Sequence, residues 1–93
     1  MYAEIKDIEF FLPKKILLKN QYNKISKYNK IFDKTGIATV SVSNKNQSAL
    51  DLAVKSSKLL LKRNKKNIDC IIYVTQSPEY NLPSGSCIIQ DRL

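Results

Sequence analysis

The segment that most constrains the fold is residues 68–75, IDCIIYVT, because it is apolar with almost no alternation. A half-buried strand alternates, whereas a strand covered on both faces reads as a continuous apolar run, as in a parallel sheet. Such a strand requires strands beside it and further layers on both of its faces. The sequence therefore predicts an α/β domain, with Cys70 as a small buried side chain in this strand.

Two further segments complete a strand–helix–strand unit. Residues 2–12, YAEIKDIEFFL, begin with alternation and stop at Pro13, which cannot donate to a ladder, so they predict a strand. Residues 48–63 predict a helix, because a serine and an aspartate resemble a capping box and apolar residues recur every three or four positions. We expect strands 2–12 and 68–75 to be parallel neighbours, with the helix packed on one face.

The other segments predict shorter elements. Residues 14–20 read as a connection, and Asn20 is the expected cap of a helix with one apolar face. Gly36 is the expected left-handed residue after that helix, and residues 37–43, IATVSVS, read as a short strand or an extended loop. A last helix begins shortly after Pro83. Because two principal strands cannot form an independent sheet, we expect the chain to be part of a longer protein.

The charge balance is strongly basic. The net charge is +8 at pH 7, and only Arg63 and Arg92 of the sixteen basic residues are arginines. Such an excess attracts acidic partners, including nucleic acid, an anionic membrane or an acidic protein. Phosphate binders usually favour arginine for its bidentate fork, however. A coding bias toward lysine, asparagine and isoleucine accounts for the excess without any function.

The sequence contains two cysteines and no histidine. We expect both thiols to be free, since disulfides are rare in reducing compartments. No apolar run is long enough to span a membrane and the N-terminus lacks the pattern of a secretory signal, so the expected location is cytoplasmic. Cys87 follows PSGS at the start of a predicted helix, where reactive thiols are often found. The missing histidine argues against Cys–His catalysis and an ordinary zinc site within these residues.

Five stretches, in this order, resemble the N-terminus of β-ketoacyl-acyl carrier protein synthase III, a condensing enzyme of the thiolase superfamily. They are MYAEIKDIEFFLPKKIL, KTGI, SALDLAVKSSKLLL, IDCIIYVTQS and PEYNLPSGSCIIQDRL. The resemblance implies a thiolase-like α/β fold, of which residues 1–93 form a partial N-terminal domain: the first βαβ unit and the start of the following helix. It also implies an acyltransferase that performs a decarboxylative Claisen condensation in fatty acid, related lipid or polyketide synthesis.

The same resemblance implies where the functional residues lie. The family's catalytic cysteine, histidine and asparagine correspond to positions beyond this chain, so no catalytic residue is expected here, and the chain alone is expected to be inactive. Cys87 corresponds to a non-catalytic position. Leu82 corresponds to a position that lines the acyl pocket of a dimer partner, and the positions near coenzyme A are Lys30, Lys34 and Thr35. Each of these four is also readable as an ordinary loop, surface or turn residue.

The sequence departs from the family near the coenzyme. Lys30 stands where members often carry a tryptophan that stacks on adenine, and a neutral ATVSVS replaces a basic run. Another acyl donor, carried on a protein, fits both departures. The resemblance implies no permanently bound cofactor, a coenzyme A or other acyl thioester as substrate, and a homodimer. The expected partner is acyl carrier protein, docked at the basic surface around Lys30 and Lys34, and neither nucleic acid nor a membrane is an expected partner.

Two other functions stay open. A small basic nucleic-acid-binding domain would use the lysines of residues 14–34 and stack bases on Tyr22 and Tyr28, although these tyrosines also fit an apolar helix face and no RNP or GXXG motif is present. A steep loss of binding with salt would identify it. A non-catalytic interaction fragment of a split condensing enzyme would leave the cysteine, histidine and asparagine to a separately encoded chain.

Overall fold

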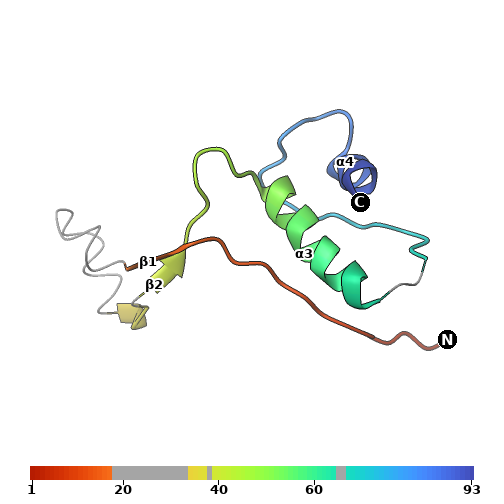
Figure 1. Ribbon diagram of the computed structural model, residues 1–93, viewed down its shortest axis with the longest axis horizontal. Coiled ribbons are helices and arrows are strands. Elements are labelled where there is room, and N and C mark those ends of the chain that lie inside the picture. The colour runs from red at the N-terminus through yellow and green to blue at the C-terminus, as the bar shows by residue number, and fades with distance from the viewer. Residues whose placement is uncertain (18–33, 38, 65–66) are drawn as a thin grey trace. The chain divides into compact units, whose positions relative to one another are not determined.

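The structure is a computed structural model that describes residues 1–17, 34–37, 39–64 and 67–93. Their elements are β1 (Lys15–Leu17), β2 (Thr39–Ser41), α3 (Ala49–Arg63) and α4 (Gly85–Arg92) (Figure 1). The chain divides into two compact units: a smaller one of residues 12–44, and a larger one of residues 1–11 and 45–93. Across the described ranges, neither helix has the length and apolar character that crossing a membrane requires.

The smaller unit contains an antiparallel pair of strands. β1 pairs with β2, with Ile16 opposite Val40, and the Val42 amide donates to the Lys14 carbonyl at 3.1 Å. Strand β2 confirms the extended segment predicted at residues 37–43. The prediction that the segment containing β1 is only a connection is wrong, because β2 supplies a ladder partner that the local pattern does not reveal.

The turn that precedes β2 is built around Gly36. Its φ of 70° lies in the left-handed region that glycine adopts without a steric penalty, as the sequence predicts. Just before it, the Thr35 hydroxyl accepts a hydrogen bond from the Ile37 amide at 3.3 Å. The helix predicted from Asn20 falls within residues 18–33, outside the described residues.

Helix α3 begins at a capping box and confirms the helix predicted over residues 48–63. Ser48 Oγ accepts from the Asp51 amide at 3.2 Å, and Asp51 Oδ2 accepts from the Ser48 amide at 2.8 Å. This reciprocal pair satisfies two amides that a helix start leaves open. The basic side chains of Lys62 and Arg63 lie in the last turn, where they suit the negative end of the helix dipole.

The core of the larger unit lies between α3 and α4. Leu50, Val54 and Ile89 are buried, and Leu50 has only 2% of its surface exposed. The partly buried residues that pack around them are Ala53, Ile71, Tyr73 and Ile88. An ion pair between Arg92 and Asp51, 2.8 Å long, joins the end of α4 to the first turn of α3.

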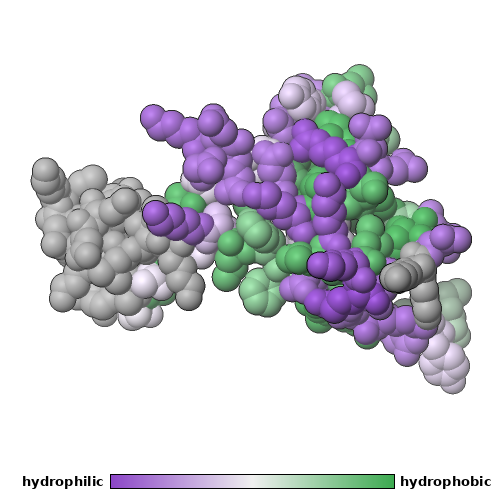
Figure 2. Space-filling model, viewed as in Figure 1, coloured by the Kyte–Doolittle hydropathy of each residue, from purple (hydrophilic) through white to green (hydrophobic). Residues whose placement is uncertain are grey.

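Residues 67–75 are extended and have one covered face and one bare face. Ile71 and Tyr73 pack on the core, whereas Ile72 and Val74 have 85% and 87% of their surface exposed. Because of this bare face, hydrophobic residues are exposed on the surface of the larger unit (Figure 2). The structure contains no strand here, and Cys70 is exposed, so its predicted burial is not observed. No ladder partner among the described residues lies beside this segment.

Residues 2–12 also form no strand, although residues 7–11 run along α3. Asp7 bonds to Arg63 at the end of α3, and Phe11 lies against Lys55, two turns earlier. Several apolar side chains of the segment are left exposed, among them Ile8 and Phe10. The strand predicted at residues 2–12 is therefore not observed, because a strand forms only when a neighbouring strand completes its hydrogen bonds.

The extended segment 67–75 runs along α3 in the same direction as residues 7–11. Ile68 lines a cavity with Leu61, near the end of α3, and Tyr73 lines another with Leu50, near its start. Both segments are thus antiparallel to α3 and parallel in direction to each other, which is the order that a βαβ unit requires. Their pairing stays a prediction, since no hydrogen-bonded ladder joins them in the structure.

Candidate functional site

The residues predicted near coenzyme A belong to the smaller unit. Lys34 and Thr35 are exposed and have helical backbone just before Gly36. Lys30 lies outside the described residues, as do Tyr22 and Tyr28 of the nucleic-acid alternative. Leu82 belongs to the larger unit. A common site for these residues therefore stays a prediction.

Leu82 extends from the loop that precedes α4. It has 86% of its surface exposed, and its role in an acyl pocket stays a prediction. What this position offers is an apolar side chain held away from the core of its own unit.

Cys87 lies in the first turn of α4 and is exposed. Its Sγ accepts a hydrogen bond from the Ser84 hydroxyl at 3.2 Å. It lines a cavity of about 270 Å³ together with Cys70, and among the described residues of that lining only Asp69 has a charged side chain. Both cysteines are free, as predicted. Within the described residues no cationic side chain contacts this thiol, so it lacks the partner that stabilises a reactive thiolate.

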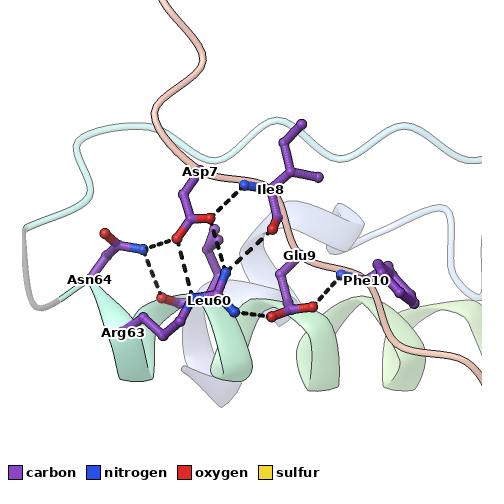
Figure 3. Close-up of polar contacts among 7 residues, drawn as sticks. All are labelled: Asp7, Ile8, Glu9, Phe10, Leu60, Arg63 and Asn64. Atoms are coloured by element: carbon purple, nitrogen blue, oxygen red, sulfur yellow. Dashed lines mark hydrogen bonds and ion pairs between the residues drawn. The ribbon is translucent and has the colours of Figure 1, made fainter.

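A polar cluster that the sequence did not predict joins residues 7–9 to the end of α3 (Figure 3). The Arg63 guanidinium lies 3.0 Å from Asp7, also pairs with Glu9, and donates to the Ile8 carbonyl at 3.3 Å. Asn64 donates to the Asp7 carboxylate and to a backbone carbonyl of the helix. One side chain thus holds three consecutive residues of the extended segment.

The cluster fixes the protonation state of its carboxylates. Hydrogen bonds from Asn64 and then Arg63 lower the pKa of Asp7, and those from the Phe10 amide and then Arg63 lower the pKa of Glu9. Hydrogen bonds to Glu9 and then to Asp7 raise the pKa of Arg63. A carboxylate with a lowered pKa is a weak base, and Arg63 pairs with both carboxylates, so this cluster positions the chain rather than performing chemistry.

The pattern that could have revealed the cluster is weak. Asp7 and Glu9 are two residues apart, which places them on one face of an extended segment. Their partner lies more than fifty residues away, so only the tertiary structure brings them together. In the described part of the chain, no group of three or more metal-ligating side chains is placed to hold a metal ion.

A helix packed on an extended apolar segment, with the far face of that segment bare, is typical of a layered α/β domain. Curated relatives identify which one. The chain is 31% identical over 99 residues to β-ketoacyl-acyl-carrier-protein synthase III of Sulfurovum sp. (strain NBC37-1), covering 100% of this chain and 29% of the relative. It is 31% identical over 98 residues to the synthase of Syntrophomonas wolfei, covering 100% of this chain and 30% of that protein.

A third relative, the synthase III of Wolbachia pipientis subsp. Culex pipiens, is 35% identical over 88 residues, covering 89% of this chain and 28% of the relative. No family model matches the sequence. No solved structure matches it significantly. The chain is related along its whole length to the N-terminal part of β-ketoacyl-acyl-carrier-protein synthase III, and it spans about 30% of the length of these relatives. The relationship implies a thiolase-like fold for the domain to which it belongs.

Proposed function

We propose that these residues form the N-terminal part of an acyltransferase of the β-ketoacyl-acyl-carrier-protein synthase III type. The observation that carries the proposal is similarity over the whole chain to several proteins of that name. The complete protein would extend an acyl group by two carbons in fatty acid or related lipid and polyketide synthesis. Its location would be cytoplasmic, and it would act as a homodimer.

The reaction we propose has two stages. A cysteine thiolate attacks the acyl thioester of coenzyme A or of a carrier protein, and the donor leaves as a free thiol. Malonyl-acyl carrier protein then loses carbon dioxide, and the carbanion attacks the enzyme-bound acyl thioester. The cysteine thiolate leaves and a β-ketoacyl-acyl carrier protein is released. Histidine and asparagine side chains would stabilise the developing negative charge by hydrogen bonds.

None of those three catalytic groups is assigned to this segment. The 93 residues contain no histidine, and Cys87 lacks a cationic partner among the described residues. No permanently bound cofactor is needed for this chemistry. The role we propose for the segment is to shape the acyl pocket and to dock the substrates.

Leu82 would line the acyl pocket of the dimer partner, and its exposed, apolar side chain supports this role. Lys30, Lys34 and Thr35 would lie near the coenzyme A or carrier-protein entrance. The exposed ammonium of Lys34 suits a phosphate or an acidic carrier protein. The resemblance implies that family members often carry a larger aromatic side chain at the Leu82 position, so we expect the leucine to give a deeper pocket and to favour a longer acyl donor.

The experiment uses the longer protein that contains these residues. Condensation with malonyl-acyl carrier protein is measured with acyl thioesters of increasing chain length. We expect Leu82→Phe to shift the preference toward shorter acyl groups, by about tenfold or more in relative kcat/KM, because one or two lost methylenes are worth that much in an apolar pocket.

The matched control is Leu93→Phe, which enlarges another exposed leucine of the same unit and should leave the chain-length preference unchanged. An unchanged preference in Leu82→Phe would contradict the role of Leu82. A longer protein that condenses no acyl thioester would contradict the proposed function itself.

A further inference from the structure

Helix α3 carries a surface that none of the roles above uses. Three lysines surround two apolar side chains over an open hollow of about 250 Å³, and we call these residues the lysine surface: Lys55, Lys58, Lys62, Phe11 and Leu59. The lysines are spaced by three and four positions, which places them on one side of the helix. Leu59 has 42% of its surface exposed, so the apolar floor is open to solvent.

The charges of the lysine surface have no partners within its unit. The ion pairs of the described residues involve Lys6, Arg63 and Arg92, and none involves the three lysines. The ammonium of Lys55 lies 4.9 Å from the centre of the Phe11 ring, a cation–π contact that keeps its full charge. Three like charges within about two turns repel one another, and a negatively charged partner relieves that repulsion.

We propose that the lysine surface docks an acidic amphipathic helix of a partner protein. Carboxylates spaced by three and four positions on such a helix match the spacing of the three lysines. One apolar side chain from the same face of the partner would enter the hollow and contact Leu59 and Phe11. The occupant must therefore combine a row of acids with an apolar residue among them, as an amphipathic helix does.

The same features favour a protein helix over two other anionic partners. A nucleic acid backbone has no apolar group to fill the hollow, and the ammonium of Lys55 lies over one face of the Phe11 ring, where a stacked base would have to displace it. A membrane would require a broader apolar surface, because interfacial binding scales with the apolar area that is buried. Leu59 and Phe11 provide only a small floor.

This inference goes beyond the proposed function and does not depend on it. The lysine surface lies wholly in the larger unit, whereas Lys30 and Lys34, assigned above to substrate docking, lie in residues 12–44. Its test needs no catalysis. Failure of the docking experiment would leave the condensing activity untouched, and the reverse also holds.

The probe is a labelled synthetic helical peptide with glutamates spaced by three and four positions and a leucine between them. Its binding to the 93-residue chain is measured by fluorescence anisotropy at low and at physiological salt. We expect Lys58→Gln/Lys62→Gln to weaken binding about tenfold at low salt and less at high salt, because screening reduces surface attraction. Leu59→Gln should weaken binding at both salt concentrations, since the hollow contact is apolar.

Matched controls separate this surface from general basicity. Lys14→Gln/Lys45→Gln removes the same charge from exposed positions elsewhere and should leave binding unchanged. Lys58→Arg/Lys62→Arg keeps the charge and should retain binding, so it guards against a variant that loses binding by unfolding. Circular dichroism checks the helix content of each variant.

Four outcomes would overturn the proposal. The unaltered chain does not bind the peptide, a peptide of the same composition in scrambled order binds equally well, or the control pair weakens binding as much as the lysine pair. In the fourth outcome, a single-stranded RNA oligonucleotide or a phosphatidylserine vesicle binds through Lys58 and Lys62 while the acidic peptide does not. That outcome would assign the surface to nucleic acid or to membrane instead.

Discussion

At the scale of single residues, Arg63 contributes more contacts than its position in the sequence suggests. Its guanidinium pairs with Asp7 and Glu9 and also donates to the Ile8 carbonyl. A planar fork with five donors can hold several acceptors at once, whereas an ammonium offers a point charge without that geometry. The position of residues 7–9 along α3 therefore depends on arginine rather than on positive charge alone.

Arg63→Lys should loosen residues 7–9 from α3 without unfolding the helix. The lysine keeps one ion pair but loses the simultaneous contacts with Asp7, Glu9 and the Ile8 carbonyl. We expect faster proteolysis within residues 1–11 and an unchanged helical signal by circular dichroism. Arg92→Lys, at the exposed ion pair with Asp51, is the control and should leave that cleavage rate unchanged. Equal cleavage in the unaltered chain and Arg63→Lys would show that the cluster does not hold the segment.

The same cluster predicts a pH dependence with a definite sign. The pKa values of Asp7 and Glu9 are lowered from ordinary values of 3.8 and 4.5, so the attached state binds fewer protons than the detached one. Attachment is therefore complete above the ordinary values and is lost as the pH falls through the lowered ones. We expect constant amide exchange in residues 7–10 from neutral pH to about pH 5, after correction for intrinsic rates, and faster exchange in stronger acid. Loosening between pH 7 and 5 would contradict this assignment.

At the scale of elements, the sequence predicts α3 well and the extended segments poorly. The bounds of α3 follow from a capping box and a periodicity that lie within the helix itself, so they can be read locally. The strands predicted at residues 2–12 and 68–75 need partners distant in sequence, and none is paired with them here. Ile72 and Val74 are apolar but exposed, which agrees with the sequence-based prediction that both faces of this segment are suited to burial.

The capping box yields a stability prediction for α3. Ser48→Ala removes the hydroxyl that accepts from the Asp51 amide, and this should lower the stability of the helix by about 1 kcal/mol. The measurement is thermal unfolding followed by circular dichroism. Ser56→Ala is the matched control, because its hydroxyl bonds the Ala53 carbonyl within the helix and alanine is the better helix former. A loss in Ser56→Ala as large as in Ser48→Ala would argue against capping as the cause.

At the scale of the whole molecule, the candidate site is only partly readable from these 93 residues. The resemblance seen in stretches such as LPSGSCIIQDRL agrees with the relatives found, whose matches cover the whole chain. The chain covers only 29–30% of those relatives, so they are about three times longer. Leu82 and Lys34 fall in different units, so neither spacing nor local pattern brings them together. The Arg63 cluster escaped prediction for the same physical reason: its members are distant in sequence and meet only after folding.

The last prediction concerns what the chain does alone. Purified by itself, it should release no carbon dioxide from malonyl-acyl carrier protein, because it contains no histidine and the described residues that line the cavity at Cys87 include no cationic side chain. In the longer protein, which is the positive control, Cys87→Ala should keep turnover. Turnover by the 93-residue chain that Cys87→Ala abolishes would make Cys87 the nucleophile.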